Sequence, residues 1–165
     1  MESKNVLHIV TVSFVINHFF GNQFNYLKKY GNVYYLGCTP SAEFSQLSDV
    51  YGYKKFDVEV TRNISPIKDI IAIFNIIKFI KKNDIDIIVG HTPKGGMVAM
   101  ITGFLCGLQQ RVYFRHGIIY ETCTGLKRFL LKNIDRLSGT LAQKVVCVST
   151  DVKAYNGQKY SHYIL

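Results

Sequence analysis

The amino-acid sequence predicts an α/β fold, Rossmann-like, with one parallel sheet and helices on both faces in three layers. Two observations predict it. Short apolar, β-branched runs of strand length alternate along the chain with longer segments of helical periodicity. The runs are nearly all apolar, which is typical of parallel strands buried on both faces by crossover helices.

Length and composition favour a single domain. With 165 residues, 48% of them hydrophobic, the chain has enough apolar side chains for one core, whereas two smaller domains would each bury less surface. We expect the domain to cover residues 1–150. Residues 151–165 are polar, rich in tyrosine and without helical periodicity, so we expect a divergent, frayed tail there.

The first three elements follow from β-branched runs and punctuating residues. The run Val6–Ser13 predicts the first strand. Asn17 offers a cap for a helix that we expect to run to about residue 29, and Gly31 stops it. Asn32–Cys38, rich in Val and Tyr, predicts the second strand.

A short helix, an edge strand and a long helix come next. The short helix is predicted over residues 41–50, and Phe56–Thr61 alternates apolar and polar residues as an exposed or edge strand does. Ser65 and Pro66 are a strong start signal for a helix that reaches Lys82. This helix carries one wide apolar stripe, formed by Ile67, Ile70, Ile71, Phe74, Ile77 and Ile80.

The remaining elements complete six strands and five helices. Asp86–Val89 predicts a short buried strand, and Gly95–Leu108 predicts a tightly packed helix of small residues. Arg111–His116 predicts the fifth strand, Leu126–Leu141 a helix, and Lys144–Ser149 the sixth strand.

The formal net charge of +9, from 20 Lys and Arg against 11 Asp and Glu, favours an anionic partner, although a solvated basic surface gives the same count. No basic motif for nucleic-acid binding is present, so we expect no nucleic-acid partner. The four cysteines have no C-x-x-C spacing, and we expect neither a metal site nor a disulfide, as suits a reducing cytoplasm. We find no run of about 18 apolar residues and expect no transmembrane helix.

Polar residues gather at three strand ends, where open α/β sheets bind ligands. After the first strand there is no G-x-G-x-x-G, which argues against a dinucleotide dehydrogenase. After the fourth strand, His91 and Lys94 precede two glycines at a helix start, an arrangement that suits an anion. The glycines also fit a helix that merely packs closely on the sheet. Arg115 and His116 end the fifth strand, and Glu121 follows it; a histidine in this place can act as acid, base or hydrogen-bond partner.

A basic stripe lies on the last helix. Arg128, Lys132 and Arg136 are spaced by four residues, and Lys127 flanks them. With the apolar residues of the same helix, the stripe fits an interfacial helix that meets anionic lipid. A solvated basic face is the alternative.

The segment 91–122, HTPKGGMVAMITGFLCGLQQRVYFRHGIIYET, and the later KVVCVS at 144–149 resemble the N-terminal domain of bacterial family 4 glycosyltransferases, which have the two-domain GT-B fold. The resemblance is to enzymes that assemble capsule, O-antigen or other lipid-linked glycans. Their pattern is a His-x-Pro-Lys-x-Gly segment, a small-residue helix, a strand ending in His-Gly and a strand ending in V-x-V-S. The likeness extends over about Val6–Ser149.

This resemblance implies a metal-independent transfer of a sugar from a nucleotide sugar, with no cofactor. In such enzymes the N-terminal domain receives the acceptor and the C-terminal domain grips the donor. By position, His116 resembles the strand-end histidine that faces the donor sugar and is our catalytic candidate. His91 and Lys94 resemble the segment that lines the cleft, and Gly21 resembles part of a glycine loop near the diphosphate, where the usual glycine pair is reduced to one. Arg115 and Glu121 complete the substrate-binding candidates.

The sequence ends soon after Ser149, without the second Rossmann-like domain or its Glu-x-x-x-x-x-x-x-Glu motif. We therefore expect a truncated transferase half that is inactive alone, whose partners are a lipid-linked glycan acceptor, an anionic membrane surface and a separate C-terminal-domain protein. Its expected location is cytoplasmic, at the inner face of the plasma membrane. The alternative is a stand-alone binding or accessory module for an anionic glycan-lipid or a partner transferase.

Overall fold

The computed structural model describes residues 3–117, 119–148 and 162–164, which form one sheet of seven strands. All strand pairs are parallel, in the spatial order β3-β2-β1-β4-β5-β6-β7. The strands are β1 (Asn5–Ile9), β2 (Val33–Cys38), β3 (Lys54–Asp57), β4 (Ile87–His91), β5 (Gln110–Arg115), β6 (Lys144–Cys147) and β7 (His162–Ile164). The first six have the order of a doubly wound Rossmann sheet, which confirms the predicted fold class.

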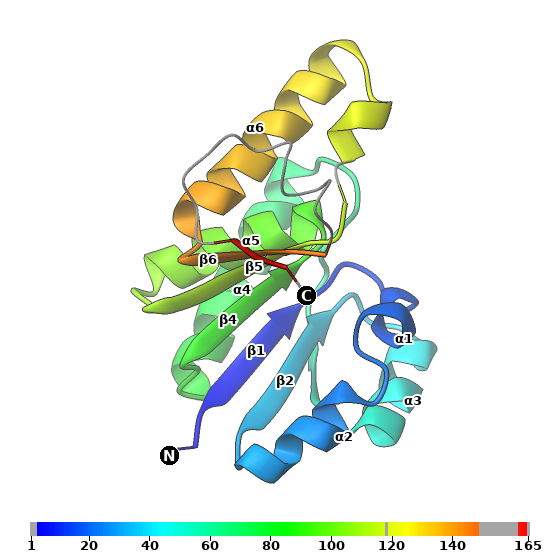
Figure 1. Ribbon diagram of the computed structural model, residues 1–165, viewed down its shortest axis with the longest axis vertical. Coiled ribbons are helices and arrows are strands. Elements are labelled where there is room, and N and C mark those ends of the chain that lie inside the picture. The colour runs from blue at the N-terminus through cyan, green and yellow to red at the C-terminus, as the bar shows by residue number, and fades with distance from the viewer. Residues whose placement is uncertain (1–2, 118, 149–161, 165) are drawn as a thin grey trace.

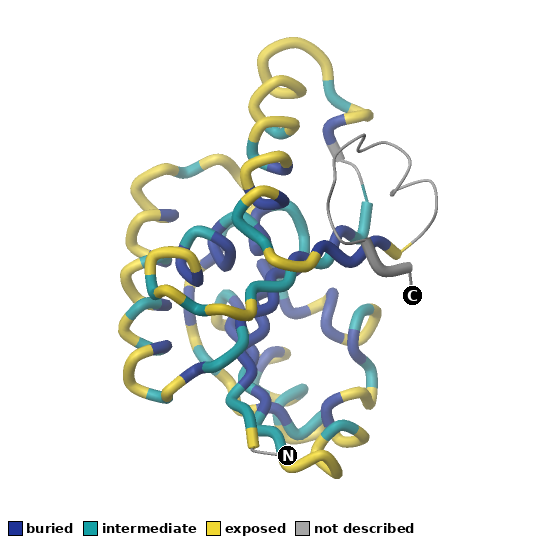
Figure 2. The backbone as a smooth tube through the Cα atoms, turned by 60° about the vertical axis from the view of Figure 1, so that its left-hand side comes forward, coloured by how far each residue is buried: buried dark blue, intermediate teal, exposed yellow. Residues whose placement is uncertain are grey.

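Helices cover both faces of the sheet (Figure 1). The α-helices are α1 (Val15–Phe19), α2 (Gln23–Leu27), α3 (Ala42–Tyr51), α4 (Pro66–Lys82), α5 (Pro93–Leu105) and α6 (Gly125–Leu141), with 3₁₀ turns η1 (Lys28–Tyr30) and η2 (Ile119–Thr122). Residues of α1, α2 and α3 form one buried cluster with one face of β1 and β2. Residues of α4 and α5 form a second cluster with the opposite face. Figure 2 shows the buried backbone concentrated along the central strands between these layers.

The strand β7 was not predicted, and it corrects the expectation of a frayed tail for three of the tail's residues. It extends β6 in register, with Val145 opposite His162 and Cys147 opposite Ile164. A free sheet edge presents a row of backbone donors and acceptors, and a β-favouring stretch such as His-Tyr-Ile satisfies them. The rest of the predicted tail, residues 151–161 and 165, lies outside the described residues.

The predicted first helix is wrong in outline, because the chain folds it as two short helices. Gly21 stands between α1 and α2 with a φ of +47°, in the left-handed region. Gly21 N–H and Phe20 N–H both donate to the carbonyl of Ile16, so the helical ladder ends there. The strand before it is also shorter than predicted, since β1 ends at Ile9.

Helix α4 begins at Pro66 as predicted, but only part of its apolar stripe is buried. The face toward the sheet is made by Asp69, Ala72, Ile76 and Ile80. Of the other apolar residues of the stripe, Ile77 is half-buried, and Ile67, Ile70, Ile71 and Phe74 are between 54% and 76% exposed.

Glycines bring α5 unusually close to the sheet. A Cβ on Gly96 would lie 2.3 Å from the ring of Tyr113, and a Cβ on Gly90 would lie 2.7 Å from the backbone of Gly96. Cβ atoms in proteins essentially never approach other heavy atoms so closely, so larger residues would push helix and strand apart. Gly96, one of the two glycines after Lys94, therefore allows the helix to pack closely on the sheet.

Candidate functional site

The strand order reverses between β1 and β4, with β5 next to β4, and doubly wound sheets bind ligands at the carboxyl ends of the strands at such a point. A cavity of about 660 Å³ opens at this edge. Its size is that of a ligand pocket. The apolar lining residues are Phe14, Val15, Phe19, Ile64, Pro93, Leu131 and Ile134. The other lining residues are Thr11, His18, Arg62, Asn63, Thr92, Lys94, His116, Gly117 and Lys127.

The charges on the described lining residues are all positive. Arg62, Lys94 and Lys127 contribute the cations, and no Asp or Glu lines the cavity among the described residues. Arg62 and Lys127 are exposed, and the guanidinium of Arg62 lies 5.6 Å from the ring centroid of Phe14. An apolar cavity with several cations suits an anion that carries an apolar group.

Lys94 is buried, and its charge is paired inside the protein. Its Nζ donates to Oδ2 of Asp69 on α4 at 2.5 Å, with side chains 9% and 12% exposed. The residue before the helix, Thr92, has φ 66° and ψ 159°, a conformation that is costly for a side chain with a β-carbon. The hydroxyl of Thr92 also accepts a hydrogen bond from Gly95 N–H. Thr92 and Lys94 are thus held rigidly at the cavity wall.

His8 of β1, His91 of β4 and His116, which directly follows β5, form a hydrogen-bonded chain. Nδ1 of His8 lies 3.0 Å from Nε2 of His91, and Nδ1 of His91 lies 3.0 Å from Nε2 of His116. His8 and His91 are buried, whereas His116 is half-buried and lines the cavity. Phe19 stacks on His116 with ring centroids 3.6 Å apart.

Burial keeps these rings neutral at pH 7. It lowers the pKa of His8 to about 3 and that of His116 to about 4. The pKa of His91 is also held well below its usual value, chiefly by burial and then by the neighbouring His8 and His116. A chain of neutral imidazoles offers hydrogen bonds rather than charge to a ligand.

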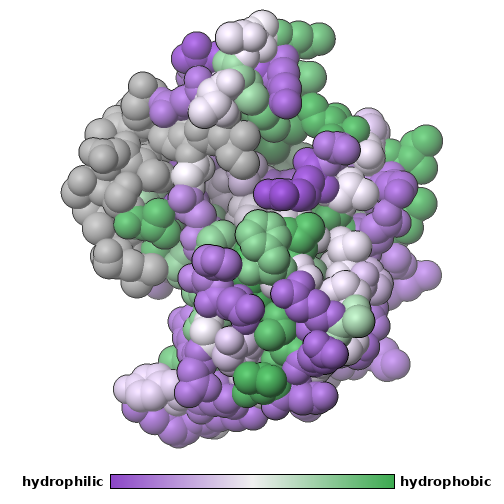
Figure 3. All heavy atoms as spheres, turned by 90° about the vertical axis from the view of Figure 1, so that its right-hand side faces the viewer, coloured by the Kyte–Doolittle hydropathy of each residue, from purple (hydrophilic) through white to green (hydrophobic). Residues whose placement is uncertain are grey.

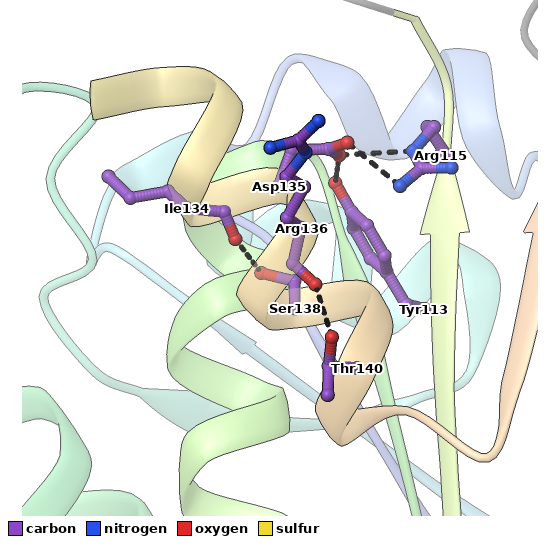
Figure 4. Close-up of polar contacts among 7 residues, drawn as sticks. All are labelled: Tyr113, Arg115, Ile134, Asp135, Arg136, Ser138 and Thr140. Carbon is purple, nitrogen blue, oxygen red and sulfur yellow. Dashed lines mark hydrogen bonds and ion pairs between the residues drawn. The ribbon is translucent and has the colours of Figure 1, made fainter. Parts of the chain in front are cut away.

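Arg115 is placed away from the cavity, in a buried cluster that joins β5 to α6 (Figure 4). Its Nε and Nη2 donate to the two carboxylate oxygens of Asp135 at 3.0 and 2.8 Å, and the hydroxyl of Tyr113 donates to the same carboxylate at 2.9 Å. Arg115 is 2% exposed. Its predicted part in substrate binding stays a prediction that this placement does not favour.

The other predicted residues are on the surface. Glu121 is exposed and Gly21 half-buried, and neither belongs to the cavity lining. Arg128, Lys132 and Arg136 are exposed along α6, which projects beyond the sheet (Figure 1). Among the described residues, no helix is long and apolar enough to cross a membrane, and no group of three or more His, Cys, Asp and Glu side chains is arranged to hold a metal ion.

Sequence reasoning missed His8, Arg62 and Asp69 as parts of this region. His8 gave a signal, since it is a polar residue inside an otherwise apolar strand. Arg62 and Asp69 gave none, because each is one charge among many and acquires its place only through packing.

Comparison with known proteins assigns the family. The model of the family described as "Glycosyl transferase 4-like" matches residues 7–149. The chain belongs to this glycosyltransferase 4-like family. The resemblance inferred from the His-Thr-Pro-Lys and Arg-His-Gly segments is thereby confirmed.

Two curated proteins that resemble this chain in sequence carry the name of a glycosyltransferase. The capsular polysaccharide biosynthesis glycosyltransferase CapM of Staphylococcus aureus is 24% identical over 153 residues, which cover 93% of this chain and 39% of CapM. The UDP-Gal:α-D-GlcNAc-diphosphoundecaprenol α-1,3-galactosyltransferase of Escherichia coli is 27% identical over 93 residues, 56% of this chain and 24% of that protein. The family member therefore spans less than half the length of either relative.

Solved structures support the fold of the family. A glycosyltransferase from Rickettsia africae superposes with a TM-score of 0.74 at 16% identity, over 99% of this chain and 43% of its own. A UDP-N-acetylglucosamine 2-epimerase from Rickettsia bellii superposes with a TM-score of 0.67 at 12% identity, over 93% of this chain and 41% of its own. At such identities the likeness concerns the fold, which proteins of different activities share.

Proposed function

We propose that this chain is the acceptor-binding part of a glycosyltransferase, and that the acceptor is a glycan carried on a lipid diphosphate. The observation that carries the proposal is the cavity at the ends of β1, β4 and β5, with its apolar wall and cationic rim. The names of the two relatives, one a capsular polysaccharide enzyme and one acting on a diphosphoundecaprenol-linked sugar, agree with such an acceptor.

Each part of the cavity suits one part of such an acceptor. The exposed cations Arg62 and Lys127 line the cavity, no carboxylate is among the described lining residues, and the two cations would hold the diphosphate. Leu131 and Ile134 of α6 offer apolar surface to the first isoprene units. The half-buried His116 would hydrogen bond to a sugar hydroxyl or a phosphate oxygen.

The donor in our proposal is a nucleotide sugar, bound outside these 165 residues. Transfer requires donor and acceptor to be held together in one geometry. Because the chain spans less than half of its relatives, we propose that it binds the acceptor without transferring sugar by itself. A binding or accessory role for the same anionic glycan-lipid uses the same site, and turnover with a donor-binding partner protein would distinguish the two.

The proposal includes a membrane surface as the source of the lipid. On α6, Leu126 and Phe129 are 72% and 64% exposed and stand among Arg128, Lys132 and Arg136. Figure 3 shows hydrophobic and hydrophilic residues side by side at the top of the molecule, where α6 lies in Figure 1. Exposed apolar residues interleaved with cations are the composition of a helix that lies in an anionic lipid interface.

The test is calorimetric titration of the purified chain with GlcNAc-diphosphofarnesol, with farnesol and with UDP. We expect the diphosphate lipid to bind and the neutral alcohol and the nucleotide to bind far more weakly. Arg62→Gln and Lys127→Gln should each weaken lipid binding by roughly five- to tenfold, because each removes about 1 kcal/mol, the worth of one ordinary hydrogen bond. Lys81→Gln, an exposed lysine of α4 outside the cavity lining, is the control. Equal binding of farnesol, or equal affinities for all variants, would contradict the proposal.

A further inference from the structure

His8, His91 and His116 lie on a diagonal across β1, β4 and β5. The sheet register places His8 opposite Val89 and His91 opposite Phe114, so each histidine lies two residues beyond the partner of the one before. Side chains two residues apart share a face of a sheet. The three rings therefore stand on the face that α1 and α2 cover, in a row that runs from the core to the cavity.

The geometry of the rings suits hydrogen bonds in their planes. The planes of His8 and His91 differ by 18° and those of His91 and His116 by 29°, with nitrogens 3.0 Å apart at both junctions. Imidazole N–H bonds and lone pairs lie in the ring plane, so near-parallel planes align donor with acceptor.

Aromatic neighbours close the sides of this row. Phe20 meets both His8 and His91 edge-on, at centroid distances of 5.4 and 4.7 Å, and Phe24 meets His8 at 5.2 Å. Phe19 lies flat on His116. These rings leave little access for water, so the buried nitrogens bond to one another.

Counting protons leaves only two arrangements. Each neutral ring carries one proton, and His91 must donate at one junction and accept at the other. If His8 donates from Nδ1, His91 donates from Nδ1 to His116, and Nδ1 of His116 carries a proton. If His116 donates from Nε2, the protons sit on Nε2 throughout, and Nδ1 of His116 is a lone pair. An arrangement with His91 doubly protonated would place a charge in a buried position.

We propose that His8 and His91 are positioning residues that set the hydrogen-bonding role of His116, with the three imidazoles changing tautomer as one unit. Nδ1 of His116 has no hydrogen-bond partner among the described residues, and His116 lines the cavity. This nitrogen is a donor when the protons sit on Nδ1 of all three rings and an acceptor when they sit on Nε2. A ligand with acceptor oxygens, such as a diphosphate, selects the state in which all three protons sit on Nδ1. The identity of this ligand rests on the proposed function, whereas the coupling of the three rings does not.

The first test needs no ligand. Long-range ¹H–¹⁵N correlation spectra of histidine-labelled protein at pH 7 give the tautomer of each ring. We expect His8, His91 and His116 to show the same tautomer, or the same fraction of the two. His18 is the internal reference, because its Nδ1 lies 3.0 Å from the carbonyl oxygen of Phe14 and must carry the proton there. Different tautomers at His8 and His116 would overturn the proposal.

Two variants of the buried end sharpen the test. His8→Phe keeps the aromatic packing and removes the partner of Nε2 of His91, and an N–H is better accommodated than a lone pair against a ring face. We expect His116 in this variant to shift toward the Nε2 tautomer, and GlcNAc-diphosphofarnesol to bind roughly five- to tenfold more weakly. His8→Asn, whose amide can donate or accept near the position of Nδ1, should restore both. A purely structural His8 would leave the spectrum of His116 unchanged in both variants.

Ligand titration of the wild-type chain separates this proposal from the proposed function. Addition of GlcNAc-diphosphofarnesol should move the ¹⁵N signals of the buried His8 together with those of His116, toward protonated Nδ1. Movement of His116 without His8 would contradict the coupling while leaving acceptor binding intact. Failure of the lipid to bind would contradict the proposed function, and the spectra of the free protein and its His8 variants would still decide the coupling.

Discussion

Arg115, a residue that is 2% exposed, donates two hydrogen bonds to Asp135, whereas the next residue, His116, is half-buried at the cavity and bonded to His91. Successive side chains of a strand point to opposite faces of the sheet. Tyr113 and Arg115 therefore meet α6, and His116 meets the layer of α1. Two polar residues that look equivalent in the sequence enter two different buried polar groups.

The two polar groups differ in charge and in whether they reach the cavity. The cluster of Tyr113, Arg115 and Asp135 contains a buried ion pair that joins α6 to the sheet, and Nη1 of Arg115 is buried there without a hydrogen-bond partner among the described residues. The chain of His8, His91 and His116 is neutral and has one end at the cavity. The buried ion pair stabilises one arrangement of its side chains. The neutral histidine chain has two tautomeric arrangements, and a ligand in the cavity can stabilise one of them.

The largest effect on stability should come from breaking the charged cluster. Asp135→Ala leaves the guanidinium of Arg115 buried without a counter-charge, so we expect the free energy of unfolding to fall by about 3–5 kcal/mol. Urea unfolding followed by circular dichroism measures it. The exposed Glu121→Gln is the matched control, expected within about 0.5 kcal/mol of wild type. A double variant, Arg115→Met with Asp135→Leu, should regain most of the loss. A fall of less than about 1 kcal/mol in Asp135→Ala would mean that the cluster does not anchor α6.

The buried histidines His8 and His91 should make the free energy of unfolding depend on pH. The pKa values of His8 and His91 are lower in the folded than in the unfolded chain, so the unfolded chain binds their protons first as the pH falls. The contribution of these two rings to the free energy of unfolding is therefore complete above pH 6.5. Below that pH it declines, by up to about 1.4 kcal/mol per pH unit for each ring. His8→Phe should make the decline between pH 6.5 and 4.5 shallower, while Lys81→Gln should follow the wild type. Parallel curves for His8→Phe and wild type would show that His8 takes no part in it.

The smallest effect on stability is expected at the basic stripe of α6. Replacing Arg128, Lys132 and Arg136 by Gln should change the free energy of unfolding by less than about 0.5 kcal/mol, because all three are exposed. Binding to phosphatidylglycerol vesicles, measured by co-sedimentation, should nevertheless weaken, by about 1 kcal/mol per lost charge at low salt. The matched control replaces Lys78, Lys81 and Lys82 of α4 by Gln. If the α4 triple weakens binding more than the α6 triple, the membrane face belongs to α4 and its exposed isoleucines.

The alternation of apolar runs and helical segments was sufficient for the fold class and for most element positions. Strong local signals, such as Ser65-Pro66 before α4, located helix starts within a residue or two. The errors lie where local signals are weak. The predicted helix from Asn17 to about residue 29 runs through Gly21, whereas in the structure Gly21 has a positive φ and separates two short helices, whose Phe20 and Phe24 are buried in one cluster.

The sequence by itself determined that His91, Lys94, Arg115 and His116 lie at or just beyond the carboxyl ends of parallel strands, because strand ends are set by local apolar runs. Only the tertiary structure decided what each side chain does. The order and register of β1, β4 and β5 join His8 to His91 across 83 residues of chain and His91 to His116 across 25. Packing of α4 and α6 likewise gives Lys94 and Arg115 their carboxylate partners. Hydrogen bonds and ion pairs act over about 3 Å, and the chain neighbours of these residues carry no information about which distant residues arrive within that range.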